Sequence, residues 1–295
     1  MPPVPEHELV TPQLLRSWPL PAPTGGKESR GRILIVGGSA EVPGAVLLAA
    51  EAALRAGAGK LQVATVASVV GALSVALPEA LVRALEETPG GAVAGGAAEQ
   101  VRDLAEGASA VLIGPGMTDV EEAQGVTDRL LEQLECPVVL DALGMASLTA
   151  APDCLHRLRA RAVLTPNPSE LAITLHRDDT EIEDDPAGAA LELAKQAQAT
   201  VALGGATSWI ASPTGALWRD ESGGAGLGVS GSGDVRAGVT AGLLARGAEP
   251  DQAAVWAAHL HGRAGERLAA SIGKFGFLAR EIPGEIPRVL AEIEL

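Results

Sequence analysis

A glycine-rich turn followed by an aspartate is the part of the sequence best suited to chemistry. The run Gly231-Ser232-Gly233-Asp234 leads into residues 235–246, which are predicted to form a helix. Glycine allows close backbone approach, and the free N–H groups of a helix start can bind an anion. Asp234 would lie beside that anion as a base, kept ionised by the helix dipole. The pattern indicates transfer between a nucleotide phosphate and a substrate hydroxyl, although an aspartate here can also be an ordinary helix cap.

Short apolar runs that end in glycine or polar residues alternate with predicted helices along the chain. The expected strands are residues 32–36, 60–66, 110–113, 137–140, 162–164 and 200–203, with a hairpin at 209–212 and 216–218. This alternation predicts an α/β fold with a mainly parallel sheet and helices on both faces. The crossover connections should be right-handed.

Glycine or polar residues follow most of these strands, at the edge where open α/β sheets bind ligands. They are Gly37-Gly38, Gly114-Pro115-Gly116, Asp141, the loop at Asn167, and Gly204-Gly205. Their convergence predicts a single cleft. Each also has a structural explanation, because glycines suit tight turns and Asp141 could cap a helix over 142–148. Neither the GxGxxG nor the Walker phosphate-binding pattern is present.

Three other polar features leave structural and functional interpretations open. Glu170 could orient a metal-bound water, or it could complement the dipole of the helix that it begins. His259 and His261 lie two positions apart in a predicted helix over 253–268, so they face different directions and should pack rather than share a metal. The acidic run 178–185 is predicted to be a solvated loop.

Composition limits the classes of partner. The chain has 295 residues, 47% of them hydrophobic, which is enough for a full core. With 22 basic and 37 acidic residues its net charge is −15, so nucleic-acid binding is not expected and a bound nucleotide should carry a divalent cation. Cys136 and Cys154 show neither disulfide nor metal spacing and are expected to pack in the core.

The first 30 residues differ in composition from the rest of the chain. Prolines at positions 19, 21 and 23 predict an extended arm, with one short helix near 12–17. Residues 31–295 are predicted to be a single catalytic domain. Since no signal peptide and no membrane span are recognisable, we expect a cytoplasmic protein without a membrane partner.

Taken together, these motifs resemble the ADP/ATP-dependent NAD(P)H-hydrate dehydratases, a family with a ribokinase-like fold. The resemblance covers nearly the whole chain, through Leu9–Leu15, Gly31–Ser39, Gly57-Ala58-Gly59, Pro78–Arg83, Gly114–Gly116, Leu164–Glu170, Gly231–Asp234 and Gly276–Ile282. It implies a three-layer sandwich and a metabolite-repair lyase that uses ADP or ATP with Mg²⁺. The ring hydroxyl of hydrated NADH or NADPH would be phosphorylated, and loss of phosphate would restore the double bond. A homo-oligomer is also implied.

The resemblance also assigns roles to individual positions. Asp234 would activate the substrate hydroxyl, and the phosphate would be held by Gly231, Ser232 and Gly233. The hydrated dinucleotide would contact Ala45, Gly116, Asn167 and Asp234. The adenine nucleotide would lie against Gly204, Gly205, Ala206, Thr207 and Ser208. For the metal, Glu170 acting through water is the candidate.

Several site positions depart from the family pattern. The family's Pro-His-Pro-Gly-Glu is Pro166-Asn167-Pro168-Ser169-Glu170 here, and its Asp-Ala-Asp-Ala-Leu is Asp141-Ala142-Leu143-Gly144-Met145. Its Lys-Gly is Gly204-Gly205, which removes a phosphate-pairing cation, and Arg236 stands where leucine is usual.

Three functions therefore remain open from the sequence. They are the dehydratase, a ribokinase-like kinase of a sugar or vitamin alcohol, and a nucleotide-binding protein with impaired catalysis. The sequence distinguishes neither ADP from ATP nor NADH hydrate from NADPH hydrate.

Overall fold

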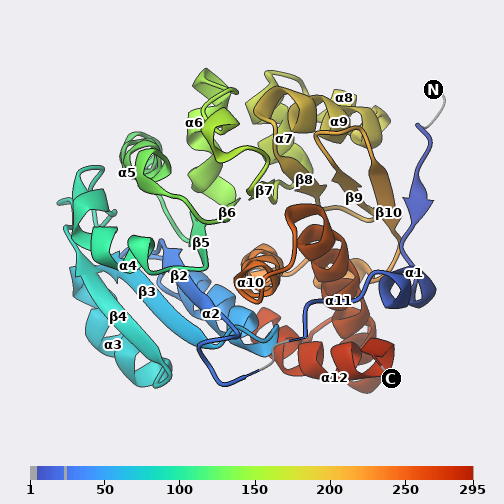
Figure 1. Ribbon diagram of the computed structural model, residues 1–295, viewed down its shortest axis with the longest axis horizontal. Helices are drawn as coiled ribbons and strands as arrows, with labels where there is room; N and C mark the ends of the chain where they lie inside the picture. Colours follow the sequence, from blue (N-terminus) through green and yellow to red (C-terminus); the bar gives the residue numbers. More distant parts are fainter. Residues whose placement is uncertain (1–4, 23–24, 295) are drawn as a thin grey trace.

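The structure, a computed structural model, describes residues 5–22 and 25–294. Its strands form one ten-stranded sheet (Figure 1). They are β1 (Glu8–Leu9), β2 (Arg32–Val36), β3 (Lys60–Val66), β4 (Ala80–Leu85), β5 (Ala110–Ile113), β6 (Val138–Leu140), β7 (Ala162–Leu164), β8 (Thr200–Leu203), β9 (Ser208–Ala211) and β10 (Leu217–Asp220).

The sheet is mainly parallel, as predicted. Its spatial order is β1-β10-β9-β8-β7-β6-β5-β2-β3-β4. All neighbours from β8 to β4 are parallel, whereas β9 is antiparallel to both β8 and β10, and β1 pairs in parallel with β10. The chain runs outward from β2 to β3 and β4, and then returns to place β5 on the other side of β2. This reversal creates a topological switch point between β2 and β5, where such sheets bind ligands.

Helices cover both faces of the sheet (Figure 1). They are α1 (Pro12–Ser17), α2 (Gly44–Arg55), α3 (Val70–Ala76), α4 (Arg102–Glu106), α5 (Val120–Gln133), α6 (Ala146–Ala150), α7 (Pro168–Leu175), α8 (Asp179–Asp184), α9 (Pro186–Ala197), α10 (Ser232–Ala245), α11 (Pro250–Ser271) and α12 (Ile282–Glu294). One buried cluster contains side chains of α2, α10, α11 and α12. A second contains side chains of α4, α5, α6, α7 and α9. The layers are thus helices, sheet and helices, and the fold class is confirmed.

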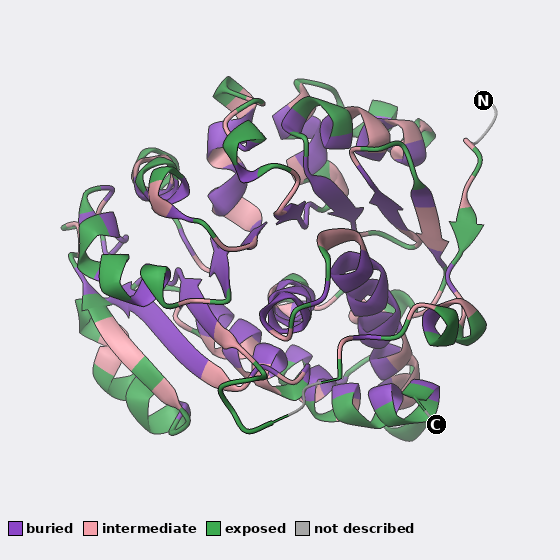
Figure 2. Ribbon diagram, viewed as in Figure 1, coloured by how far each residue is buried: buried purple, intermediate pink, exposed green. Residues whose placement is uncertain are grey.

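The central strands are buried, as their purple colour in Figure 2 shows. In β2, Ile33 and Ile35 belong to one core cluster and Leu34 and Val36 to the other. Successive side chains of a strand point to opposite faces. A continuous apolar run is therefore what a strand between two helical layers requires.

Helix α10 lies directly against helix α2 through glycines. A Cβ on Gly238 would be 2.2 Å from the carbonyl oxygen of Ala49, and one on Gly242 would be 2.4 Å from that of Ala53. The backbones of the two helices can approach this closely only because small residues meet at the contact. This packing accounts for a core rich in alanine and glycine with 2% aromatic residues.

Some boundaries and elements differ from the sequence predictions. Helix α10 begins at Ser232 rather than at 235, so Asp234 lies inside its first turn. The hairpin strands are Ser208–Ala211 and Leu217–Asp220, displaced from the predicted 209–212 and 216–218. Strands β1 and β4 were not predicted, because two residues and a half-exposed edge strand carry little pattern.

The acidic run 178–185 was wrongly predicted to be a loop. It contains helix α8, which begins with a capping box between Asp178 and Glu181. Ile182 is fully buried and fixes the helix to the core. A single apolar anchor and a good cap outweighed the high charge.

The proline-rich N-terminal segment packs onto the domain. Strand β1 pairs with β10, and Leu15 of α1 is fully buried. Gln252 and Trp256 of α11 donate hydrogen bonds to the carbonyl oxygen of Trp18. Residues 1–4 and 23–24, including Pro23, lie outside the described residues. The division into an arm and a catalytic domain stays a prediction.

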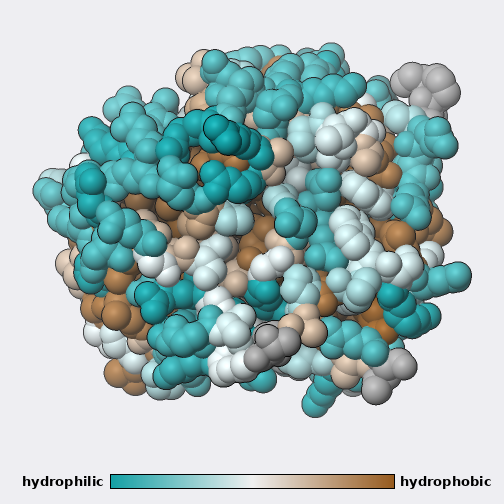
Figure 3. Space-filling view, viewed as in Figure 1, coloured by the Kyte–Doolittle hydropathy of each residue, from teal (hydrophilic) through white to brown (hydrophobic). Residues whose placement is uncertain are grey.

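On the face seen in Figure 3, hydrophilic residues gather at the upper left, over α5 and α6, and paler residues lie towards the middle. Within the described residues, no helix combines the length and the apolar character needed to cross a membrane.

The contact between α10 and α2 can be tested with Gly238→Ala. The added methyl group has no room against Ala49, so we expect the free energy of unfolding in urea to fall by about 1–3 kcal/mol. Gly284→Ala in α12 is the control, because nothing lies within 4 Å of its Cβ position. Gly284→Ala should raise the free energy of unfolding by about 0.5–1 kcal/mol. Equal effects of both variants would contradict the close contact.

Candidate active site

The turns after β2 and β5 interlock at the switch point. The N–H of Gly38 donates to the carbonyl oxygen of Pro115 at 2.7 Å. Gly116 has φ +70°, and its Cβ would lie 2.5 Å from the carbonyl oxygen of Val42 and 2.9 Å from Cβ of Ala45. The structure therefore brings Ala45 and Gly116 side by side, as expected for two positions of one binding surface. Their contact with substrate stays a prediction.

The start of α10 contains Gly231, Ser232 and Gly233, whose contact with phosphate stays a prediction. Gly231 is the N-cap with φ +90°, a conformation that favours glycine. A Cβ at this position would also meet Leu48 of α2 at 2.4 Å. Ser232 is buried and shares a 2.9 Å hydrogen bond with Nε2 of His261 in α11. The loop is thus held from two sides, with its N–H groups at the beginning of the helix.

Asp234 lies in the first turn of α10 and is partly buried. Burial, and then the charge of Glu170, raise its pKa to about 6. This direction is opposite to the one expected from the helix dipole, because desolvation outweighs the dipole. The carboxylate is still mostly ionised at neutral pH. Within the described part of the chain its oxygens accept no side-chain or backbone hydrogen bond, which leaves them available for a substrate proton.

Asp141 is the most buried carboxylate of the site. It is 6% exposed, and Oγ1 of Thr165 donates to its Oδ1 at 2.6 Å. Burial raises its pKa to about 7, and the charges of Asp234 and Glu170 act in the same direction, whereas Thr165 and Arg236 lower it. The groups that change the pKa of Asp141 come from the end of β7, from α7 and from α10. These elements and the end of β6 therefore surround one charged region. The side chain makes no helix-capping hydrogen bond.

Asn167 and Glu170 form a capping box at the start of α7. Oδ1 of Asn167 accepts from the N–H of Glu170 at 2.9 Å, and Oε2 of Glu170 accepts from the N–H of Asn167 at 2.8 Å. This is the structural role that the sequence left open for Glu170. Asn167 is exposed at the edge of the site. Its contact with substrate and a water-mediated metal contact of Glu170 stay predictions.

Arg236 is the site residue that sequence reasoning noted only as a departure. It is 8% exposed, and its Nη2 donates to the carbonyl oxygens of Thr165 at 3.2 Å and Pro166 at 3.3 Å. Its guanidinium lies over Gly204, whose Cβ would be 2.2 Å from Nη1. Arg236 of α10 thus places a cation directly beside position 204, where the sequence lacks one.

The predicted nucleotide segment connects β8 to β9. The N–H of Gly204 donates to the carbonyl oxygen of Pro166 at 2.9 Å, which joins this loop to the one after β7. Gly205 and Ala206 are exposed, and Thr207 and Ser208 are partly buried. The segment thus lies at the carboxyl edge of the sheet, next to Arg236. Its contact with nucleotide stays a prediction.

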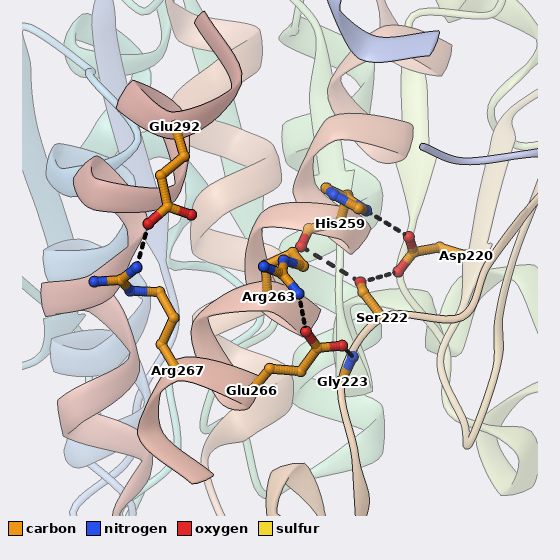
Figure 4. Close-up of polar contacts among 8 residues, drawn as sticks. All are labelled: Asp220, Ser222, Gly223, His259, Arg263, Glu266, Arg267 and Glu292. Atoms are coloured by element: carbon orange, nitrogen blue, oxygen red, sulfur yellow. Dashed lines mark hydrogen bonds and ion pairs between the residues drawn. The ribbon is translucent and has the colours of Figure 1, made fainter. Parts of the chain in front are cut away.

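A polar network holds the segment between β10 and the Gly231 loop (Figure 4). Nδ1 of His259 contacts Oδ1 of Asp220 at 2.8 Å, and Ser222 donates to the other oxygen of the same carboxylate. The N–H of Gly223 donates to Oε1 of Glu266 at 2.9 Å. The segment is thereby fixed to helix α11.

The two histidines of α11 have the packing roles that their spacing indicated. His259 is bonded to Asp220 and His261 to Ser232. Burial, with the charge of Arg236, lowers the pKa of His261 to about 3, so its imidazole is neutral. Among the described residues, no three His, Cys, Asp or Glu side chains are grouped to hold a metal ion.

The cysteines are unsuited to nucleophilic chemistry. Cys136 and Cys154 are free and partly buried, and burial raises the pKa of each thiol to about 11. Both remain protonated at neutral pH. Both pack against the second core cluster, which confirms the packing role expected from the sequence.

A cavity of about 450 Å³ lies at the opposite edge of the sheet. Gly31, Ser109, Pro137 and Arg161 line it, and each comes directly before a strand. None of the predicted site residues lines this cavity. We assign the site by its charged groups and its glycine turns, because ligands of open α/β sheets bind beyond the carboxyl ends of the strands.

The raised pKa of Asp141 predicts a pH-dependent stability. Between its ordinary value near 4 and about 7, the folded state keeps a proton that the unfolded state releases. The contribution of this group to stability therefore decreases as pH rises through that interval. Asp141→Asn, which still accepts from Thr165, should raise Tm relative to the wild type at pH 8, and this advantage should shrink towards pH 4. A difference in Tm that is constant with pH would contradict the burial cost.

Comparison with known proteins identifies the family of this chain. A profile of the NAD(P)H-hydrate dehydratase family matches residues 33–288. An ADP-dependent (S)-NAD(P)H-hydrate dehydratase of Xanthomonas campestris pv. campestris is 48% identical over 97% of both chains. A bifunctional NAD(P)H-hydrate repair enzyme of Moorella thermoacetica is 35% identical, and the chain spans 51% of its length. A Bacillus subtilis ADP/ATP-dependent NAD(P)H-hydrate dehydratase, co-crystallised with ATP/Mg²⁺, superposes with TM-score 0.83 at 29% identity and covers 98% of this chain and 99% of its own. The chain belongs to the NAD(P)H-hydrate dehydratase family.

Proposed function

We propose that the protein dehydrates hydrated NADH or NADPH at the expense of ADP or ATP. The observation that carries the proposal is the position of Asp234. It is a partly buried carboxylate, in the first turn of α10 beside the Gly231 loop, and it has no hydrogen-bond partner among the described residues. A base next to an anion site is what phosphoryl transfer to a hydroxyl requires.

The residues present support two chemical steps. Asp234 accepts the proton of the ring hydroxyl while the hydroxyl oxygen forms a bond to the terminal phosphorus and the nucleotide leaves, shortened by one phosphate. The phosphorylated ring then loses phosphate together with a proton from the neighbouring carbon, which restores the double bond. The N–H groups at the start of α10 bind the phosphoryl oxygens, and the turn at Gly116 and the side chain of Ala45 contact the dinucleotide.

Mg²⁺ fits this site as an ion carried by the nucleotide. It usually keeps several waters and binds through substrate phosphates and one or two carboxylates. Asp234 in the first turn of α10, and Glu170, whose charge acts on Asp234, are the candidate carboxylates. When bound, the ion would neutralise phosphate charge. The charges of Asp141 and Glu170 support the same expectation, because an uncompensated acidic region would repel a nucleotide.

Two finer expectations extend this proposal. A homo-oligomer is expected from the resemblance, and sedimentation of the purified chain would measure it. A cytoplasmic location is expected as well, and fractionation of the source cells would measure it.

The role of Asp234 is tested by Asp234→Asn. The amide cannot accept the hydroxyl proton, so nucleotide-dependent recovery of the reduced-nicotinamide absorbance should fall by at least about 10²-fold. Asp128→Asn is the matched control, because Asp128 is exposed on α5. Retained activity in Asp234→Asn would remove the assigned base. Release of a stable phosphorylated product by the wild type would instead favour a kinase.

The pKa of Asp234 predicts a pH profile. The ionised form is the active base, so kcat/KM should fall as pH decreases through about 6. Glu170→Gln keeps a capping-box side chain and removes the charge that raises this pKa, so the inflection should move to lower pH. An inflection that stays in place in Glu170→Gln would show that a different group controls the profile.

A further inference from the structure

The guanidinium of Arg236 occupies the space that a side chain at position 204 would need. A Cβ built on Gly204 would lie 2.2 Å from Nη1 and 2.7 Å from both Cζ and Nη2 of Arg236. These distances are far below any real contact. A glycine at position 204 is therefore a condition for the observed position of Arg236.

This charge is buried without the partners that a buried cation usually has. Arg236 is 8% exposed. Its hydrogen bonds within the described residues both come from Nη2, and they reach two neutral carbonyl oxygens at 3.2 and 3.3 Å. The Nε group is buried and has no hydrogen-bond partner in the part of the chain that the structure describes. Burial lowers the pKa of Arg236, and the charges of Asp141 and Glu170 oppose this. A guanidinium remains charged even so, and leaving such a group incompletely bonded is costly.

The position of the guanidinium points to what completes its bonding. It lies among three loops at the carboxyl edge of the sheet: the residues after β7, the loop at Gly204 after β8, and the start of α10. Arg236 and Asp234 both act on the carboxyl group of Asp141, so the cation and the base border the same region. An anion bound there would accept hydrogen bonds from the N–H groups at the start of α10 and from the planar guanidinium of Arg236.

We propose that Arg236 binds the terminal phosphate of the nucleotide, and that Gly204 is required to leave room for it. The proposal rests on the proposed function and adds a binding residue to it. The unused donor at Nη1 bonds a phosphate oxygen, and the added negative charge balances a cation that the neighbouring carboxylates balance only in part.

Arg236→Leu tests the proposal by calorimetric titration with ADP and AMP. AMP lacks the terminal phosphate, so a phosphate contact predicts a selective effect. We expect ADP affinity to fall by about ten- to a hundred-fold, with a much smaller change for AMP. Arg236→Lys keeps the positive charge but loses the planar, two-pronged guanidinium. Its ADP affinity should lie between those of the wild type and Arg236→Leu. Equal weakening of ADP and AMP would show that Arg236 only braces the loops, which would overturn the proposal.

The coupling between the two positions gives a second measurement. Gly204→Ala alone should displace the guanidinium and weaken ADP selectively. When Gly204→Ala is combined with Arg236→Leu, ADP affinity should be little lower than in Arg236→Leu alone, because there is no guanidinium left to displace. Gly204→Lys combined with Arg236→Leu should restore part of the ADP affinity, since an ammonium then enters the same space from the strand side. Additive losses without rescue would contradict the coupling, even if Arg236→Leu alone is poorly folded.

The wild type separates this proposal from the one on which it rests. A wild type that binds neither ADP nor ATP would overturn both. The other outcome concerns Arg236 alone. If the wild type binds ADP and dehydrates hydrated NADH, but Arg236→Leu keeps the same preference for ADP over AMP, only the role of Arg236 is overturned.

Discussion

Helix α10 can lie against helix α2 only because Gly238 and Gly242 carry no side chain. Their Cβ positions would meet the carbonyl oxygens of Ala49 and Ala53. This backbone-to-backbone contact fixes the position of α10 over the sheet. Because Gly231 at its start lies against Leu48 of α2, the same contact places the Gly231–Gly233 turn and Asp234 beside the switch point between β2 and β5. A core of small residues is thus a requirement of the site as well as of stability.

Charge is the second constraint on the site. Three carboxyl groups, Asp141, Glu170 and Asp234, lie in a partly buried region whose nearby cation is Arg236. Desolvation raises the pKa of both Asp141 and Asp234. It favours a proton on Asp141, which is more buried, and leaves Asp234 as a base whose pKa is close to neutral pH. Such separation of two carboxyl groups by their surroundings is useful for chemistry that accepts and returns protons.

Fixed hydrogen bonds hold the loops around these charges. The capping box at Asn167 orders the start of α7, and His261 holds Ser232 at the start of α10. The contact of His259 with Asp220 fixes the segment that leads to the Gly231 loop. The site is therefore organised before a ligand arrives, which lowers the entropy that binding must overcome.

By itself, the sequence determined the fold class and the strands between the helical layers, and it predicted a base at Asp234. These follow from local information, since a continuous apolar run closed by glycine indicates a doubly covered strand and a glycine loop before an apolar helix indicates an anion site. It also showed that position 204 lacks a cation. Only the tertiary structure decided that Arg236, 32 residues later, fills that space, because the contact joins a helix to a strand end that are distant in the chain. The direction of the pKa shift at Asp234 was likewise decided by tertiary packing, since burial and the charge of Glu170 outweigh the local helix dipole.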